Sequence, residues 1–428
     1  MKNFFEIVGG NQLNGTVRVQ TAKNAVLPIL SASLLCSGSV HLKNCPDISD
    51  FHNMIKILIK MGVEVCCNGK DYILNSAKAT SESIDAELAK TMRSSVFLIG
   101  STLARFKRTV FVQAGGCNIG KRPIDLHIKA FKALGVEISE KNNQLIFDAS
   151  NAKAGSIKLK IPSVGATENI VQFASLLKGK TVICNPAKEP EVVDLCNFLN
   201  CMGAKIKGAG TNKITIYGVN KLKSTHYQPI SDRVVAATIL SAVAVCGGNV
   251  TLTNVNAEHN KNFIKKLVRI GCQIKIKSDI MQVYSSKSLQ AIGKVSTGFY
   301  PKFPTDLQSL MLVIACLAKG KTCIVENIFE NRLLLADELL KMGANIRKVS
   351  SKRVEVVGVD KLTCADVEAK DLRGGAALIV AALATKGKTT IQNSGFVLRG
   401  YENLPKILQE LGANIKLIWQ KEVLLQLS

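Results

Sequence analysis

Hydrophobic and polar positions along the chain follow a pattern that returns about every 70 residues. Each return closes an amphipathic stretch with Leu, Met or Ile, followed by glycine, a small residue, any residue and a hydrophobic residue. Neighbouring glycines of this phrase are 68 to 73 residues apart, and they are Gly62, Gly135, Gly203, Gly271, Gly343 and Gly412. The spacing predicts that the 428 residues are six copies of one structural unit.

Each copy predicts the same order of elements: a strand, a polar turn, an apolar helix, a second strand, an amphipathic helix, the glycine phrase and two more strands. The first helix, as in residues 232–246, is apolar nearly all round, so we expect it to be buried on all sides. The second helix, as in residues 50–62, has Leu and Ile on one face and Lys on the other. We expect the glycine that ends it to have a positive φ.

Three such βαβαββ units around their own buried helices would form one α/β domain, and six would form two. The length of the chain agrees with more than one domain. The longest apolar runs, residues 234–246 and 307–318, are shorter than the roughly 18 residues that a membrane span requires. We therefore expect core helices and no membrane partner.

The net charge of +24 raises the question of a nucleic-acid partner. The basic residues are dispersed and aromatic residues make up only 5%, so we expect none. The chain has 44 Lys but only 12 Arg, and half of the arginines fall in loops or at helix starts: Arg93, Arg122, Arg233, Arg332, Arg373 and Arg399. Because Arg offers a planar fork for phosphate or carboxylate, these loops are typical of a site for a small polyanion.

The 13 cysteines do not predict disulfides, because their number is odd and the N-terminus lacks the apolar region of a secretory signal. We expect a reduced, cytoplasmic protein in which twelve of them are small buried hydrophobic residues. Cys117 differs, because it lies in a loop with Gly115, Gly116 and Gly120 and beside Lys121. Flexible glycines permit loop movement, and nearby cations favour the thiolate.

The first helix of each copy begins with polar residues. Helix N-termini favour anions, and plain capping explains Ser, Thr and Asp there equally well. Arg and Lys oppose the helix dipole, so an anion bound between them is the better explanation for those positions. The six starts are Lys23-Asn24, Arg93-Ser94, Thr167-Glu168, Asp232-Arg233, Thr305-Asp306 and Asp371-Leu372-Arg373.

Eight motifs in register along the whole chain resemble the UDP-N-acetylglucosamine enolpyruvyl transferase family. They are TAKNAVLPIL (21–30), AGGCNIGKRPIDLHI (114–128), SVGAT (163–167), EPEVVD (189–194), FPTDLQ (303–308), IFENR (328–332), DLR (371–373) and RGYE (399–402). Enzymes of this family move enolpyruvate from phosphoenolpyruvate to the sugar 3′-hydroxyl, which starts the synthesis of bacterial cell-wall precursors. The resemblance implies phosphoenolpyruvate and the nucleotide sugar as substrates, with no metal and no cofactor.

The resemblance also implies the fold, a two-domain inside-out α/β barrel built from six βαβαββ repeats, three per domain. The first domain would span residues 22–230 and carry the Cys117 loop. The second would combine residues 1–21 with 231–428, and the active site would lie between the domains, which close over substrate. The oligomeric state stays open, and a monomer is compatible with the sequence.

The family's phosphoenolpyruvate ligands match the positions Lys23, Asn24, Arg93, Arg122, Arg373 and Arg399. Asp306 matches the residue that accepts the proton of the 3′-hydroxyl, and Asp371 a residue at the reacting centre. The resemblance therefore implies five catalytic residues, Cys117, Asp306, Lys23, Asp371 and Arg399. In the family this Cys adds to phosphoenolpyruvate, has a proposed role in proton transfer and is alkylated by fosfomycin; the sequence leaves open which role dominates in turnover.

For UDP-N-acetylglucosamine the matching positions are Asn24, Arg93, Arg122, Pro123, Ile124, Asp125, Leu126, Ser163, Val164, Gly165, Asp306 and Ile328. The chain departs from its relatives at Ile161, Lys188, Val235 and Leu398, so the details of uridine binding and loop closure stay open. Three alternatives remain: a 5-enolpyruvylshikimate-3-phosphate synthase, which lacks the glycine-cysteine loop; a basic scaffold or nucleic-acid-binding protein without activity; and a second, specialised copy of the transferase with altered regulation.

Overall fold

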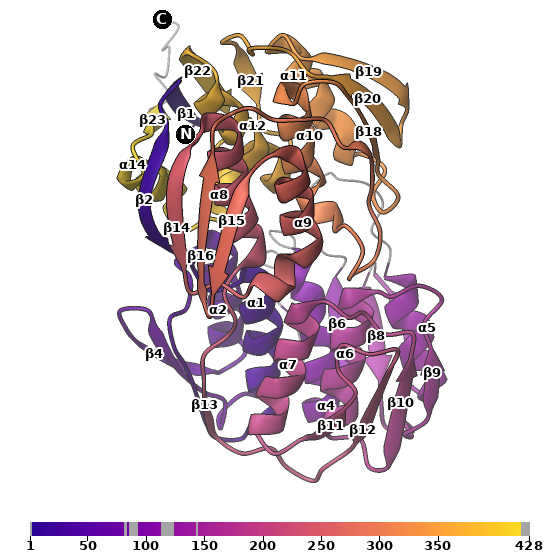
Figure 1. Cartoon of the computed structure of the whole chain (residues 1–428). Helices are drawn as coiled ribbons and strands as arrows, with labels where there is room; N and C mark the ends of the chain where they lie inside the picture. The colour runs from indigo at the N-terminus through magenta and orange to yellow at the C-terminus, as the bar shows by residue number, and fades with distance from the viewer. Residues whose placement is uncertain (1, 81–83, 85–92, 113–123, 143, 421–428) are drawn as a thin grey trace, which may run out of the picture. The chain divides into compact units, whose positions relative to one another are not determined.

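The computed structural model describes residues 2–80, 84, 93–112, 124–142 and 144–420, and it shows an α/β protein (Figure 1). The contacts between Cα atoms divide the described residues into two compact units. Unit 1 consists of residues 2–20 and 231–420, and unit 2 consists of the described residues from Thr21 to Ile230. The chain therefore leaves unit 1 after its first two strands and returns to it at Ser231.

Unit 2 contains three sheets in its described part, with strand orders β13-β3-β5-β4, β6-β8-β7 and β9-β10-β12-β11. In the first and third sheets one edge pair is parallel, and every other pairing in the three sheets is antiparallel. The strands are β3 (Ser39–Leu42), β4 (Glu64–Asn68), β5 (Asp71–Asn75), β6 (Arg108–Val112), β7 (Glu137–Lys141), β8 (Gln144–Asp148), β9 (Ser156–Lys158), β10 (Lys180–Cys184), β11 (Lys205–Lys207), β12 (Lys213–Tyr217) and β13 (Thr225–Tyr227).

Unit 1 also contains three mixed sheets, with strand orders β2-β14-β16-β15, β17-β18-β20-β19 and β21-β22-β1-β23. Figure 1 shows the indigo strands β1 and β2 among the red to yellow strands of this unit, so residues from the start of the chain complete sheets formed by its second half. The strands are β1 (Lys2–Gly9), β2 (Leu13–Arg18), β14 (Gly248–Thr253), β15 (Gln273–Lys277), β16 (Ile280–Ser285), β17 (Gly293–Ser296), β18 (Lys321–Val325), β19 (Asn345–Ser350), β20 (Arg353–Val357), β21 (Asp366–Glu368), β22 (Gly387–Gln392) and β23 (Asn414–Gln420).

The sheets are open: within the described residues none of them closes on itself into a barrel. Register is set by the strands' buried faces, as in β14, where Val250 and Leu252 are fully buried and face Val283 and Met281 of β16. The parallel partner β2 places Gly15 opposite Val250. The architecture is therefore α/β with mixed sheets.

Apolar helices form the core of each unit, as the sequence predicts. All residues of α8 (Arg233–Cys246) are buried, and it packs with α10 (Gln308–Leu317) and α12 (Leu372–Ala384) in unit 1. In unit 2, α1 (Lys23–Ala32), α4 (Leu98–Phe106) and α6 (Val164–Ser175) are similarly buried. The prediction that the first helix is buried on all sides is confirmed. None of the helices in the described ranges is both long and apolar enough to cross a membrane.

The amphipathic helices cover these cores. In α9, Phe263, Ile264, Leu267 and Ile270 are buried while the lysines lie outside. The helices are α2 (Ser49–Lys60), α5 (Asp125–Ala133), α7 (Pro190–Cys201), α9 (Lys261–Ile270), α11 (Leu335–Lys341) and α14 (Leu404–Glu410). The glycine that follows each of them has a φ between +77° and +120°, so the prediction of positive φ at all six is confirmed.

The burial predicted for the cysteines is wrong at four positions. Six thiols are buried, including Cys246 and Cys316 in the core helices. The exposed ones are Cys66, Cys67, Cys201 and Cys364. Cys66 and Cys67 lie on β4, an edge strand of its sheet, where the side chains are largely exposed. A short apolar run does not distinguish an edge strand from a central one.

Candidate active site

Asp306 is the centre of a charged cluster in unit 1. It lies in a single helical turn, η4 (Thr305–Leu307), directly before α10. Arg373, near the start of α12, donates from Nε to Asp306 Oδ1 at 3.1 Å. Arg332, at the start of a second short turn, η5 (Arg332–Leu334), places Nη2 3.6 Å from the same oxygen. Two arginines distant in sequence therefore hold one carboxylate.

The arginines decide the charge of Asp306. Burial alone raises the pKa of this carboxyl, but the positive charges of Arg373, Arg332 and Arg233 outweigh burial and hold the pKa below its usual range. Asp306 is therefore ionised at neutral pH. Its side chain is 24% exposed, so another molecule can reach the carboxylate. For Arg373, burial lowers the pKa, but the charges of Asp306, Tyr401 and Asp232 and the hydrogen bond to Asp306 together raise it by more, so the guanidinium stays charged.

Two further carboxylates of unit 1 cap the core helices. Asp232 accepts hydrogen bonds from the N–H groups of Val234 at 2.8 Å and Val235 at 3.1 Å. Asp371 accepts from the N–H groups of Arg373 at 2.8 Å and Gly374 at 3.1 Å. Plain capping, the alternative left open for acidic helix starts, therefore describes both positions. The cap on α12 also fixes the backbone from which Arg373 reaches Asp306.

Arg332 retains hydrogen-bonding capacity beside this carboxylate. It is 3% exposed, and its Nε and Nη1 atoms have no hydrogen-bond partner among the described residues. Its guanidinium lies over the ring of Phe329, 5.2 Å from the centroid. Gln308, which is fully buried at the start of α10, likewise has no partner for its carboxamide within the described ranges. Because buried donors without partners are costly, this cluster is suited to an anionic ligand.

Glu326 joins two segments of the site. Its carboxyl group is fully buried and accepts from the hydroxyl groups of Thr297 and Thr305, each at 3.0 Å. It also accepts from the N–H groups of Ile328 at 2.8 Å and Phe329 at 3.2 Å. Thr305 precedes Asp306, and Ile328 begins the segment that leads to Arg332. Glu326 thereby ties the turn of Asp306 to the loop of its arginine.

We predict that Glu326→Ala lowers the free energy of unfolding of unit 1 by about 3 kcal/mol, because four donors lose a buried acceptor. Urea unfolding followed by the fluorescence of the single tryptophan, Trp419 of β23, measures this unit. Glu330→Ala, an exposed glutamate in the same segment, is the matched control and should be neutral. Equal stabilities of the two variants would show that the Glu326 bonds contribute little.

In unit 2, Lys23 is a cation paired with a carboxylate, as Arg373 is in unit 1. It is the first residue of α1, and its Nζ lies 2.7 Å from Oδ2 of Asp50 on α2. The Lys23 side chain is 13% exposed and that of Asp50 is 2% exposed, so the ion pair is largely desolvated. Asn24 follows on the same turn, and Arg93 is the first residue of the short helix η2 (Arg93–Phe97). All three predicted positions are therefore helix starts of unit 2.

The positions predicted for the nucleotide sugar in unit 2 lie at two neighbouring helix starts. Ile124 precedes α5, and Asp125 and Leu126 are its first residues. The side chain of Asp125 is 49% exposed, and its Oδ2 lies 3.6 Å from Nζ of Lys129. Ser163 caps α6 by accepting from the N–H of Ala166 at 3.3 Å, and Val164 and Gly165 follow. The helices α5 and α6 pack together.

Gly165 allows this close packing. A Cβ atom at this position would lie 2.9 Å from Nε2 of His127 on α5, which is closer than side-chain atoms approach. A larger residue would therefore require the His127 ring or one of the two helices to shift.

The structure describes only some of the remaining predicted positions. Arg399 is half-buried and ends the one-turn helix α13 (Gly395–Leu398). Ile328 has its N–H engaged by Glu326, so a ligand would contact its side chain or carbonyl. Cys117, Arg122 and Pro123 lie outside the described residues.

One helix start does not match the anion-site pattern. Glu168 on α6 is fully buried, and neither carboxyl oxygen has a hydrogen-bond partner among the described residues. Burial, followed by the charges of Glu191 and Glu189, raises its pKa well above the usual range, which favours the neutral acid. The third copy therefore contributes a buried carboxyl group here instead of a cation.

Four residues of these clusters were not among the predicted catalytic and substrate-binding residues: Arg233, Arg332, Glu326 and Asp50. The scarcity of arginine singled out the first two, but nothing in the sequence assigned them to Asp306. Glu326 and Asp50 gave no signal, since single acidic residues near strand ends and helix starts are common.

Two solved structures that share this fold are enolpyruvyl transferases. The enolpyruvyl transferase NikO from Streptomyces tendae matches with a TM-score of 0.88 and 22% identity, over 98% of this chain and all of that one. EPSP synthase from Acinetobacter baumannii matches with a TM-score of 0.75 and 18% identity over the same shares of the two chains. At these identities the likeness concerns the fold, which defines the class as the enolpyruvyl transferase fold.

The sequence comparisons identify the family. The family model described as EPSP synthase (3-phosphoshikimate 1-carboxyvinyltransferase) matches residues 7–408. UDP-N-acetylglucosamine 1-carboxyvinyltransferase 2 of Caldanaerobacter subterraneus subsp. tengcongensis is 45% identical over 411 residues, covering 96% of this chain and 98% of the relative. UDP-N-acetylglucosamine 1-carboxyvinyltransferase of Halothermothrix orenii is 43% identical over 412 residues, with 96% and 99% covered. The chain therefore belongs to the EPSP synthase family of carboxyvinyl transferases.

Proposed function

We propose that the chain transfers the enolpyruvyl group of phosphoenolpyruvate to the 3′-hydroxyl of UDP-N-acetylglucosamine and releases phosphate, the first committed step of peptidoglycan precursor synthesis in the cytoplasm. The names of relatives at 43% and 45% identity over nearly the whole chain support this acceptor. The observation that carries the proposal is Asp306, an accessible carboxylate held ionised by three arginines.

The reaction is an addition followed by an elimination. C3 of phosphoenolpyruvate gains a proton, which makes C2 electrophilic, and the sugar 3′-oxygen bonds to C2 while Asp306 takes the hydroxyl proton. C3 then loses a proton, the double bond forms again and the C2–O bond to phosphate breaks. The proton added to C3 is balanced by the proton that C3 loses, phosphate carries away the electron pair of the broken bond, and Asp306 releases the hydroxyl proton to solvent.

The arginines make Asp306 a weak base before substrate arrives, because they favour its ionised form. Phosphoenolpyruvate brings a carboxylate and a phosphate, whose negative charges offset the field of Arg373, Arg332 and Arg233. The pKa of Asp306 therefore rises when phosphoenolpyruvate binds, toward the range in which a carboxylate accepts a proton efficiently. Base strength and substrate binding are coupled through the same cations.

Cations at helix starts bind phosphoenolpyruvate in this proposal. Lys23, pre-ordered by Asp50, and Arg373, pre-ordered by Asp306, offer charge without having to be desolvated at the moment of reaction. The other predicted ligands are Asn24, Arg93, Arg122 and Arg399. Asp371 supports this set by capping α12 beneath Arg373.

The nucleotide sugar contacts the starts of α5 and α6. Free N–H groups at helix starts suit the pyrophosphate, and the two starts are formed by Ile124, Asp125 and Leu126 and by Ser163, Val164 and Gly165. Pro123, which has no N–H, is the remaining proposed contact of the first segment. Ile328 adds an apolar contact, and its loop is fixed by Glu326.

The same proposal extends to the fold. Five of the six described sheets share one order, a parallel edge pair followed by two antiparallel pairings, and the sheet β6-β8-β7 shows the two antiparallel pairings. This supports six βαβαββ repeats around buried helices, arranged as an inside-out barrel pair, with one domain at 22–230 and the other at 1–21 and 231–428.

Cys117 provides a further prediction. From its glycine-rich, cationic sequence context we expect Cys117→Asp to lower the rate of inactivation by fosfomycin by more than about 10³-fold, because Asp lacks the nucleophilic sulfur. Some transfer activity should remain, since a carboxylic acid can still exchange a proton. Time-dependent inactivation measures the first effect, and Cys364→Asp, an exposed thiol elsewhere, is the control. Unchanged sensitivity would identify another group as the target.

Acceptor specificity tests the function itself. The protein is incubated with phosphoenolpyruvate and either UDP-N-acetylglucosamine or 3-phosphoshikimate, and the products are identified by mass spectrometry. We expect an enolpyruvyl ether of the nucleotide sugar and no enolpyruvyl ether of 3-phosphoshikimate. Transfer to 3-phosphoshikimate would instead assign the chain the activity named by the family model.

A further inference from the structure

The backbone that follows Arg399 is held by a side chain from near the start of the sequence. Gln20 is half-buried and is the last residue of the N-terminal part of unit 1. Its Nε2 donates to the carbonyl of Gly400 at 3.2 Å, and its Oε1 accepts from the N–H of Glu402 at 2.8 Å. The donor and the acceptor of one carboxamide are therefore both bonded to the segment directly after Arg399.

Tyr401, between these two bonded residues, anchors the same segment in the core. It is 2% exposed, and its hydroxyl oxygen lies 2.9 Å from Oγ1 of Thr238 on α8. Thr238 donates its single hydroxyl hydrogen to the carbonyl of Val234 at 2.9 Å. The Tyr401 hydroxyl is therefore the donor to Thr238, and burial, which raises the pKa of Tyr401, keeps its proton in place at neutral pH.

Both anchors lead to α8, the fully buried core helix of unit 1. Thr238 is a residue of this helix. The carbonyl of Gln20 accepts from the N–H of Asp232 at 2.8 Å, and Asp232 caps the helix. One buried helix therefore fixes the two groups that hold the segment after Arg399.

We propose that Gln20 and Tyr401 are positioning residues that keep the backbone of Arg399 ordered for the binding of phosphoenolpyruvate. This rests on the proposed function, in which Arg399 is a ligand of that substrate. Ordering a backbone segment costs conformational free energy, so a segment that is ordered beforehand allows tighter binding. Without the two anchors, phosphoenolpyruvate has to order residues 399–402 itself and binds more weakly.

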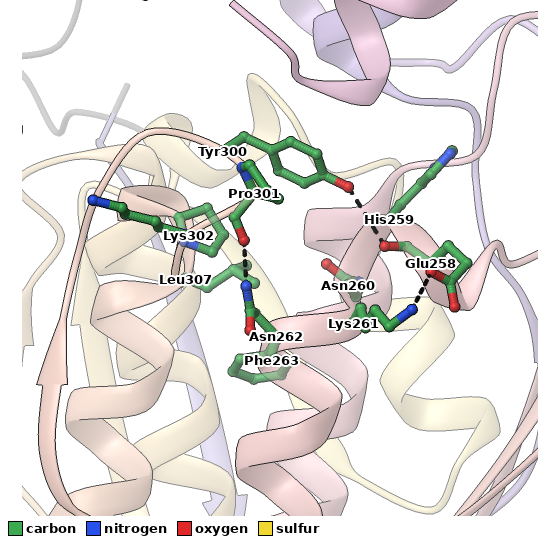
Figure 2. A pocket seen from close by; sticks show the side chains of 11 residues that line it. Glu258, His259, Asn260, Lys261, Asn262, Phe263, Tyr300, Pro301, Lys302 and Leu307 are labelled. Atoms are coloured by element: carbon green, nitrogen blue, oxygen red, sulfur yellow. Dashed lines mark hydrogen bonds and ion pairs between the residues drawn. The ribbon is translucent and has the colours of Figure 1, made fainter. Parts of the chain in front are cut away.

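Asn262 provides the matched control for Gln20, because it makes the same kind of bond elsewhere in unit 1. Figure 2 shows its carboxamide donating from α9 to the carbonyl of Pro301, and both residues line a cavity of about 150 Å³. The segment held by this bond, residues 300–302, contains none of the proposed ligands. Gln20→Met and Asn262→Leu each keep the approximate size of the side chain and remove its hydrogen bonds.

The test compares steady-state kinetics of the native chain, Gln20→Met, Tyr401→Phe and Asn262→Leu. We expect Gln20→Met to raise the KM for phosphoenolpyruvate about tenfold, with little change in kcat or in the KM for UDP-N-acetylglucosamine. Tyr401→Phe keeps the ring and loses one hydrogen bond, so it should raise the same KM about threefold. Asn262→Leu should keep the native KM.

Two results of these kinetics would overturn the inference: a native KM for phosphoenolpyruvate in Gln20→Met, or an equal rise of this KM in Asn262→Leu. The second result would mean that loosening any loop of unit 1 has the same effect. If Gln20→Met does not fold, Tyr401→Phe decides in its place, and a native KM there overturns the inference.

A double-mutant cycle with Arg399→Met shows whether the effect passes through this arginine. If it does, Gln20→Met causes no further rise of the KM for phosphoenolpyruvate in the Arg399→Met background. Rises that multiply would show that Gln20 acts by another route and would overturn the inference.

Crystal structures of the native chain and of Gln20→Met decide the inference even if the native chain shows no transfer, a result that contradicts the proposed function alone. We expect the backbone of residues 399–402 to shift or to have raised B-factors in the variant. A segment that keeps its native place and its native B-factors without the carboxamide would overturn the positioning role.

Discussion

Asp306→Asn is expected to lower kcat by about 10³-fold while both KM values change little. Asn has the size of Asp but cannot accept the proton of the 3′-hydroxyl. The substitution also removes the negative charge between Arg373, Arg332 and Arg233, so phosphoenolpyruvate binding should be kept or slightly improved. Initial rates of phosphate release at varied concentrations of each substrate measure the two effects separately.

Asp360→Asn is the matched control for this prediction, because Asp360 is an exposed carboxylate of the same unit. Circular dichroism spectra of both variants should coincide with that of the native chain. Near-normal turnover of Asp306→Asn would show that this carboxylate does not accept the proton and that it only orders the arginines.

Lys23→Gln is expected to raise the KM for phosphoenolpyruvate by about 100-fold. The reason is that removing the cation from a desolvated pair with the bound anion costs about 2–5 kcal/mol. The native Lys23 side chain is 13% exposed and its Nζ lies 2.7 Å from Oδ2 of Asp50, so it offers a pre-ordered charge. The variant loses that charge and leaves the negative charge of Asp50 near the anionic substrate. Isothermal titration with phosphoenolpyruvate and steady-state kinetics provide the measurements.

Lys56→Gln serves as the control for Lys23, because Lys56 is an exposed lysine of α2 in the same unit. Asp50→Asn gives a second comparison, in which Lys23 keeps its charge but loses the ion pair, and its effect should be smaller. A native KM for phosphoenolpyruvate in Lys23→Gln would exclude Lys23 from the binding of this substrate.

Much of the local structure follows from the sequence because it depends on neighbours in the chain. The glycine phrases predicted six helix ends with positive φ, and the apolar runs predicted helices buried on all sides, as observed for α8. Both signals are periodic and are repeated six times, so the copies reinforce one another. Cys66 and Cys67 show the limit, since exposure on β4 is set by its place at the edge of the sheet.

The partners within the site could not be predicted in the same way. Arg373 and Arg332 reach Asp306 from positions 67 and 26 residues away, and only the packing of α10 with α12 and the loop held by Glu326 brings them together. Charge at a helix start also has several uses. The sequence could not separate Asp371, which caps its helix, from Glu168, whose buried carboxyl oxygens have no hydrogen-bond partner among the described residues.

Phosphate release from phosphoenolpyruvate, measured with and without UDP-N-acetylglucosamine, tests the central claim most directly. We predict release only when both substrates are present, with one phosphate for each enolpyruvyl sugar formed. Release that does not depend on the sugar, or no release with both substrates present, would contradict the transfer reaction.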